Sequence, residues 1–121
     1  MAKLKVMLAE DDLTMINLLK TLLKMEGFDV IALDADDDVV NAARNNCPDV
    51  LLLDVHLSKQ NGLEILKSLR QPTDACDARI IMTSGSNLKD ECLKFGADGF
   101  LLKPFMPDDL IQMLKGNNNL L

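Results

Sequence analysis

The stretch PDVLLLDV, Pro48–Val55, decides the fold. Its nearly continuous apolar run is typical of a strand covered on both faces, as at the centre of a parallel sheet, and it ends in the acidic residue Asp54. A second run of this kind, VMLAEDD at Val6–Asp12, ends in three acidic residues. Carboxylates at the end of a buried strand repel one another and are costly to bury without a cation. The two stretches therefore predict a parallel sheet with an acidic edge that needs a positive partner.

The composition indicates one soluble domain over residues 1–121. With 48% hydrophobic residues, the chain can form one hydrophobic core and is too short for two ordinary domains. The formal net charge of −6 and the lack of a basic stripe argue against direct nucleic-acid binding. No apolar run reaches the roughly 20 residues that span a bilayer, and the first residues lack the apolar core of a secretion signal. We therefore expect a cytoplasmic protein with no membrane partner.

The three cysteines, Cys47, Cys76 and Cys92, are odd in number, scattered and without nearby histidines. This spacing indicates neither a disulfide framework nor a zinc site. We therefore expect reduced thiols in the core or on the surface.

Short apolar runs alternate with helix-period segments, which is typical of βα units around a parallel sheet. The predicted strands are Leu4–Ala9, Phe28–Leu33, Val50–Val55, Ile80–Thr83 and Gly99–Leu102. The predicted helices are Leu13–Glu26, Asp36–Asn46, Gly62–Arg70, Asn87–Phe95 and Pro107–Gly116. Because crossovers between parallel strands are right-handed, we expect an α/β fold with a five-stranded sheet in the order 2-1-3-4-5 and helices on both faces. The second strand is expected at an edge.

The first predicted helix has the clearest pattern. One helical stripe carries Met15, Leu18, Leu19, Leu22 and Met25, and Gly27 provides a left-handed stop. We expect this stripe to face the sheet.

Polar residues follow four of the five predicted strands, at the edge where ligands bind in sheets of this order. They are Glu10 and Asp11 after the first, Asp54 at the end of the third, Ser84 after the fourth and Lys103 after the fifth. Clustered carboxylates suit Mg²⁺ (or Mn²⁺), held together with waters and a phosphate group. A carboxylate is also a competent nucleophile toward phosphorus, so Asp54 is the predicted phosphoacceptor. Lys103 is expected to pair with phosphoryl oxygens, and Ser84 to donate a hydrogen bond to one.

The same residues resemble the receiver domains of two-component response regulators over essentially the whole chain. VMLAEDD is similar to the family's acidic strand end, PDVLLLDV to its phosphoacceptor strand, IIMTSG to its switch strand and KPF, Lys103–Phe105, to its closing motif. The resemblance implies a flavodoxin-like (βα)5 fold, in a single receiver domain similar to the chemotaxis type. It also implies a phosphorylation-activated signalling switch rather than a turnover enzyme. Its phosphoryl group would come from a histidine kinase or a histidine phosphotransfer protein.

The resemblance further implies a metal site that serves the domain's own phosphorylation and slow dephosphorylation. The family's acidic pair falls on Glu10 and Asp11, which leaves Asp12 to start the following helix. The implied metal ligands are Glu10, Asp11, Asp54 and the backbone carbonyl of His56. The side chain of His56 would overlook the phosphoryl group.

The switch residues implied by the resemblance are Ser84 and Phe100. Ser84 suits the position of the family's switch hydroxyl better than its neighbour Thr83, which stays an alternative. Phe100 falls where the family has an aromatic side chain that turns inward, although it can equally be a half-buried strand residue. Lys103–Pro104 would be a cis peptide bond.

The chain departs from the family pattern at two places. Ser58 stands where proline is usual, which is expected to loosen the loop after Asp54 modestly. The segment from Ser84 to Lys103 is shorter than usual, so we expect a trimmed fourth helix or entry loop. The output is expected to come from an unidentified downstream protein or from an effector domain that the sequence does not contain.

Other interpretations of the same residues are weaker. LDADDD, Leu33–Asp38, resembles the start of a calcium loop but lacks its glycine and closing glutamate, so a solvated helix start is expected. A magnesium-dependent phosphatase usually has a carboxylate two residues after its nucleophile, where this chain has His56. A phosphate-independent receiver relative stays open, whereas a flavodoxin-like cofactor binder would need aromatic stacking groups, and Trp and Tyr are absent.

Overall fold

The computed structural model describes residues 3–71 and 77–115. Its centre is a five-stranded parallel sheet in the order β2-β1-β3-β4-β5. The strands are β1 (Lys5–Ala9), β2 (Asp29–Ala32), β3 (Val50–Asp54), β4 (Arg79–Ser84) and β5 (Gly99–Leu102). The predicted sheet order is confirmed, and β2 occupies an edge as expected.

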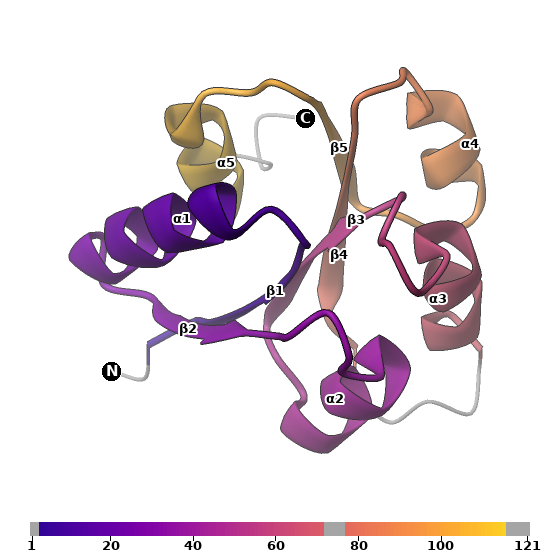
Figure 1. Cartoon of the computed structure of the whole chain (residues 1–121), viewed down its shortest axis with the longest axis horizontal. Coiled ribbons are helices and arrows are strands. Elements are labelled where there is room, and N and C mark those ends of the chain that lie inside the picture. Colours follow the sequence, from indigo (N-terminus) through magenta and orange to yellow (C-terminus); the bar gives the residue numbers. More distant parts are fainter. Residues whose placement is uncertain (1–2, 72–76, 116–121) are drawn as a thin grey trace.

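Five helices cover the two faces of the sheet. They are α1 (Leu13–Met25), α2 (Val39–Asn46), α3 (Gly62–Leu69), α4 (Lys89–Lys94) and α5 (Pro107–Leu114). Figure 1 shows α1 and α5 on one side of the sheet and α2, α3 and α4 on the other. This is the predicted flavodoxin-like arrangement. Within the described ranges, none of these helices has the length and apolar content to cross a membrane.

The central strand β3 divides the core into two clusters. All five of its residues are buried, as its apolar sequence predicts. Leu51 and Leu53 pack toward α2, α3 and α4, in a group of buried residues that we call the α2–α4 cluster. Val50 and Leu52 point the other way and pack with residues of α1 and α5, in the α1/α5 cluster. Successive side chains of β3 therefore point to opposite faces of the sheet and belong to different clusters.

Helix α1 corrects one prediction. Its buried residues are Ile16, Leu19 and Leu23, whereas Met25 and Leu18 are 76% and 49% exposed. The predicted stripe is therefore confirmed at Leu19 and Met15, which pack on the core, and wrong at Leu18 and Met25. Two adjacent apolar stripes run along this helix, and the spacing of apolar residues alone does not tell which one packs on the sheet.

The helix starts follow local capping. The Asp12 side chain accepts a hydrogen bond from Met15 N at 3.2 Å, which confirms Asp12 as the start of α1. Asp38 caps Asn41 N in the same way, so α2 begins at Val39, three residues later than predicted. Helix α4 has only six residues, in line with the predicted shortening, and Gly116, the predicted end of the last helix, lies outside the described residues.

The cysteines differ from the prediction at one position. Cys47 is disulfide-bonded, so the expectation of three reduced thiols is wrong for this residue. Spacing in the sequence does not show which cysteines meet in space. Cys92 is a free, buried thiol in the α2–α4 cluster, and burial together with the charge of Glu91 raises its pKa. Cys76 lies outside the described residues.

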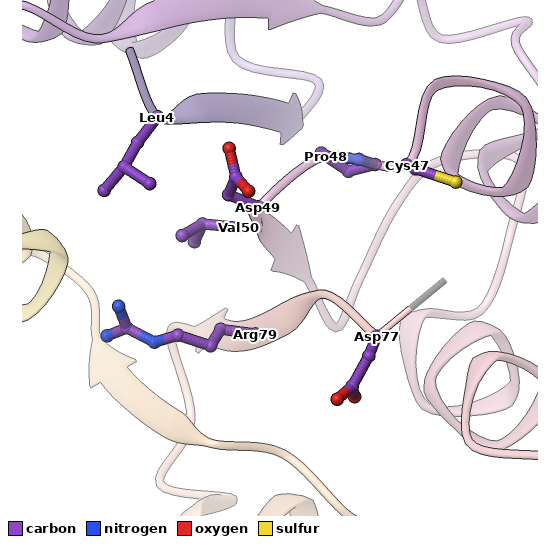
Figure 2. Close-up of a pocket in the computed structure, with 7 residues that line it drawn as sticks. All are labelled: Leu4, Cys47, Pro48, Asp49, Val50, Asp77 and Arg79. Atoms are coloured by element: carbon purple, nitrogen blue, oxygen red, sulfur yellow. The ribbon is translucent and has the colours of Figure 1, made fainter. Parts of the chain in front are cut away.

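A pocket of about 420 Å³ opens at the amino-terminal ends of the strands, away from the predicted site. Figure 2 shows Leu4, Asp49 and Arg79 around it. Its polar groups support the fold: Asp49 Oδ2 accepts from Lys5 N at 2.7 Å, and Arg79 Nη2 donates to Met113 O at 2.7 Å. These contacts hold strand starts and the end of α5 together.

Candidate functional site

Four polar residues meet at the carboxyl edge of the sheet because each lies two positions beyond a core residue of the α1/α5 cluster. Side chains two apart on a strand point to the same face. The pairs are Leu8 and Glu10, Leu52 and Asp54, Ile81 and Thr83, and Leu101 and Lys103. The apolar residue of each pair is buried in the core, and the polar residue lies at the carboxyl edge of the sheet on the same face.

Lys103 binds the two buried carboxylates of the site. Its Nζ atom lies 2.6 Å from Glu10 Oε1 and 2.9 Å from Asp54 Oδ2. Glu10 and Asp54 are each only 6% exposed. Burial alone would lower the pKa of Lys103, but its hydrogen bonds to Glu10 and Asp54 and their charges outweigh burial, so the pKa is raised. The predicted positive partner of the acidic edge is therefore present, as an ammonium group.

The remaining carboxylate oxygens of Glu10 and Asp54 are held by backbone N–H groups. Glu10 Oε2 accepts from Asp11 N at 2.9 Å and from Asp12 N at 3.0 Å. Asp54 Oδ1 accepts from His56 N at 3.1 Å. These bonds fix the turns that follow β1 and β3.

Asp11 is bound to the loop that follows β3. Its Oδ2 atom accepts a hydrogen bond from Ser58 N at 2.5 Å. Proline has no N–H group and could not donate this bond. The serine at position 58 therefore adds a tether between Asp11 and the loop, a contact that the sequence analysis missed. The signal was available, because any non-proline residue at this position restores a backbone donor.

The two neighbouring hydroxyls, Thr83 and Ser84, have different surroundings. Ser84 is fully buried, and its Oγ atom accepts from Ser86 N at 3.0 Å in the turn before α4. Thr83 lies opposite Asp54 in the strand register and is 1% exposed. In the part of the chain that the structure describes, Thr83 Oγ1 has no hydrogen-bond partner.

The other predicted residues lie around this centre. His56 follows β3 and is exposed, with its ring at the surface. Phe100 is partly buried against the α2–α4 cluster, on the sheet face opposite to Lys103. The Lys103–Pro104 peptide bond is cis, as predicted.

A second tether that the sequence did not reveal joins the loops before α2 and α3. Gln60 donates from Nε2 to Asp37 O at 2.7 Å and accepts from Val39 N at 3.2 Å. Lys59 forms an ion pair with Asp36 nearby. The acidic run before α2 is therefore a helix start held by the neighbouring loop, which agrees with the rejection of a calcium loop.

The chemistry of these groups suits a hard divalent cation. Glu10, Asp11 and Asp54 carry three negative charges against the single charge of Lys103, and their oxygens are of the kind that Mg²⁺ binds. Within residues 3–71 and 77–115, no group of three or more His, Cys, Asp or Glu side chains converges closely enough to hold a metal ion. Each carboxylate is already engaged by Lys103 or by a backbone donor. The net negative charge of the three carboxylates therefore suits a divalent cation. In this structure, however, these carboxylates bind Lys103 or a backbone donor.

Comparison with known proteins adds independent findings. The family described as response regulator receiver domain matches residues 6–115. The chain is 40% identical over 119 residues to the transcriptional regulatory protein CpxR of Escherichia coli K12, with 92% of this chain and 47% of that protein covered. It is 35% identical over 118 residues to a nitrate/nitrite response regulator protein homolog of Haemophilus influenzae, with 93% and 56% covered. The chain thus spans about half the length of these relatives.

Among solved structures, the receiver domain of the Francisella response regulator 1452 is similar with a TM-score of 0.85 and 28% identity. The match covers 97% of this chain and 98% of that one. Similarity in sequence and in fold therefore extends over nearly the whole chain.

Proposed function

The chain belongs to the response regulator receiver domain family, and we propose that Asp54 is the residue that takes the phosphoryl group in its two-component switch. Its donor would be the phosphohistidine of a histidine kinase or of a histidine phosphotransfer protein. The observation that carries this proposal is the contact of Lys103 with both Glu10 and Asp54 at the carboxyl edge of the sheet.

The transfer step follows from this arrangement. One carboxylate oxygen of Asp54 attacks the phosphorus in line, an O–P bond forms and the P–N bond to histidine breaks. The electron pair of the broken bond returns to the imidazole nitrogen. Lys103 is already next to Asp54, so its charge can move to the phosphoryl oxygens as they arrive.

We propose that Glu10, Asp11, Asp54 and the backbone carbonyl of His56 hold Mg²⁺ or Mn²⁺. When bound, the ion offsets the negative charge of the carboxylates and of the phosphoryl group. One oxygen of Asp11, Oδ2, is bound by Ser58 N, so a turn of that oxygen toward such an ion would break this bond. Glu10 must keep Oε1 on Lys103 or exchange it for the ion, because its other oxygen holds the turn after β1.

The output is proposed to be a shift between two arrangements of the surface around α4 and β5. The switch hydroxyl at the end of β4 would donate to a phosphoryl oxygen: either Ser84, which would then leave Ser86 N and change the turn before α4, or Thr83, which is paired with Asp54 in register. Phe100 lies on the strand that precedes Lys103 and would respond to the same movement. A downstream protein or an attached effector domain would detect the new surface.

A slow return to the resting state would come from hydrolysis at the same site. A water oxygen attacks the phosphorus, the O–P bond to Asp54 breaks, and phosphate leaves while the carboxylate is regenerated. A dedicated phosphatase remains the rival function. The exposed His56 ring beyond Asp54, with no carboxylate there, argues for a long-lived phosphoryl group over rapid turnover.

Intact-mass spectrometry after incubation with a small phosphodonor and Mg²⁺ tests the proposal. The wild type should gain the mass of one phosphoryl group, and Asp54→Asn should gain none. Asp77→Asn, which changes an exposed aspartate at the opposite edge of the sheet, is the matched control and should gain mass like the wild type. Rapid release of phosphate without an adduct would favour the phosphatase instead.

A further inference from the structure

The side chain of Arg70 ties the carboxyl end of α4 to two other elements. Arg70 directly follows α3, and its Nε atom donates to Gly96 O, in the loop after α4, at 2.8 Å. Its Nη2 atom lies 2.6 Å from Asp98 Oδ2, and the same oxygen accepts from Ile80 N at 2.8 Å. Its Nη1 atom donates to Ala78 O at 3.0 Å. One guanidinium therefore joins the end of α3, the start of β4 and the loop that leads to β5.

The backbone closes the same end of α4. Gly96 has a φ of +105°, the left-handed conformation that commonly ends a helix, and Ala97 N donates back to Cys92 O at 3.0 Å. Helix α3 lies beside α4 on the same face of the sheet (Figure 1), and the Nζ atom of its Lys67 is 4.3 Å from the centre of the Phe95 ring. The last turn of α4 is thus closed by its own backbone and held against α3 as well.

The amino end of α4 has fewer attachments. Among the described residues, Leu88 at its start provides no side-chain hydrogen bond to the first turn. The Oδ1 atom of Asn87 accepts from Lys89 N at 3.3 Å. The preceding turn is joined to β4 by the bond from Ser86 N to Ser84 Oγ, at the functional site. The amino end is therefore attached to the functional site, and the carboxyl end to the opposite edge of the sheet.

These attachments restrict how α4 can move. With six residues the helix is about 9 Å long, so it moves as one body instead of bending. A body that is held at one end turns about that end, as in the hinge motions of larger elements. The displacement is then greatest at the turn before α4 and smallest at Gly96.

We propose that Arg70 is a positioning residue of the switch, which fixes the pivot about which α4 turns when Asp54 is phosphorylated. The pivot consists of residues 96–98, held by Arg70. This proposal rests on the proposed function, because phosphorylation at the carboxyl edge of the sheet supplies the movement. The surface that a partner detects would therefore change over residues 85–88 and the first turn of α4, and would stay constant at the pivot.

Nuclear Overhauser effects test the pivot in the wild type, because they report which protons lie close together. Beryllofluoride, a stable analogue of the phosphoryl group, is added together with Mg²⁺. The signal between Gly96 Hα and the side chain of Arg70 should persist, since these groups are in contact and the pivot does not move. The backbone N–H signals of residues 85–90 should shift in the same sample. Loss of the signal between Gly96 and Arg70 would overturn the proposal.

Arg70→Met tests whether the arginine fixes this pivot. The variant keeps an unbranched side chain against Gly96 but removes the donors to Gly96 O, Ala78 O and Asp98. The analogue should then shift the N–H signals of residues 96–98 more than it does in the wild type, because the last turn of α4 is free to follow the amino end.

Arg79→Met is the matched control. It removes an arginine that donates to Met113 O, at the end of α5 on the other face of the sheet (Figure 1). The effect of the analogue on residues 96–98 should match that in the wild type. An Arg70 that only stabilises the fold would leave this effect unchanged in Arg70→Met, and that result would overturn the proposal.

The same spectra separate failure of the pivot from failure of the proposed function. Wild-type shifts confined to the residues around Asp54 would remove the movement of α4 and leave phosphorylation standing. If the analogue shifts no signal of the wild type, the proposed function fails, and the pivot fails with it.

Discussion

The Nζ atom of Lys103 lies 2.6 Å from Oε1 of Glu10, across 93 residues of sequence. The same ammonium reaches Asp54, so one cation compensates two carboxylates that are almost fully buried. Removal of one partner from a buried ion pair leaves the other charge uncompensated, which is more costly than loss of an exposed pair. Lys103 therefore stabilises the resting protein, and in the proposed function it would also pair with the phosphoryl group.

Replacement of Lys103 by methionine tests this double role. Lys103→Met keeps most of the aliphatic chain but leaves Glu10 and Asp54 without their cation, and should lower the free energy of unfolding by about 3 kcal/mol in metal-free buffer. Added Mg²⁺ should stabilise this variant more than the wild type, because the ion supplies the missing positive charge. Chemical denaturation with and without Mg²⁺ measures both effects.

Lys59→Met is the matched control for that experiment. Lys59 pairs with Asp36 in solvent, with side chains 61% and 79% exposed, so its loss should change the free energy of unfolding by less than about 1 kcal/mol. Equal losses in Lys103→Met and Lys59→Met would contradict the role given to the buried ammonium.

The tether between Asp11 and Ser58 predicts an effect on metal affinity. Ser58→Pro removes the N–H group that holds Asp11, so Asp11 becomes free to turn toward a metal and Mg²⁺ should bind more tightly. Ser58→Ala keeps the backbone N–H and should bind Mg²⁺ like the wild type. Calorimetric titration with Mg²⁺ compares the three proteins. Equal affinities in all three would show that the tether does not compete with the metal.

Helix α3 packs closely on the end of β3 at Gly62. A Cβ atom at position 62 would lie 2.6 Å from Val55 Cα and would also contact the Asp54 carbonyl oxygen. Because these are backbone atoms, Gly62→Ala should lower the free energy of unfolding by about 3 kcal/mol. Gly85→Ala, whose Cβ meets nothing within 4 Å among the described residues, should cost far less. Urea denaturation would contradict this account if both variants were equally stable.

Phe100 offers an optical test of the switch, since the chain contains no tryptophan. The ring packs partly buried on the α2–α4 cluster, so Phe100→Trp should place a single fluorophore where the surroundings change on activation. Its emission should shift when Mg²⁺ and beryllofluoride are added together. The added substitution Asp54→Asn should abolish the shift. An emission spectrum insensitive to the analogue would remove Phe100 from the switch.

Much of the fold could be predicted because few arrangements satisfy its local patterns. The apolar runs of β1 and β3 require cover on both faces, and right-handed crossovers then leave the order 2-1-3-4-5 as a common solution. The same order brings Glu10, Asp54 and Lys103 to one edge, since Asp54 ends its strand and the other two directly follow theirs. The strand ends could therefore be predicted to meet without knowledge of any side-chain contact.

The sequence could not predict features that depend on which neighbours meet. Helix α1 carries two apolar stripes, and only contact with the sheet selects Ile16 and Leu19 over Met25. The bond between Ser58 N and Asp11 depends on the path of a loop. Among the described residues Thr83 Oγ1 has no hydrogen-bond partner, and this depends on the groups around it, whereas a threonine in a strand is common.

The central claim is that the phosphoryl group is carried by Asp54. Borohydride reduction of the phosphorylated protein converts an aspartyl phosphate to homoserine, and tandem mass spectrometry of the peptides then locates the converted residue. We predict homoserine at position 54 in the wild type, dependent on both the phosphodonor and Mg²⁺. Conversion at Asp11 or at any other residue, with position 54 unchanged, would contradict the account.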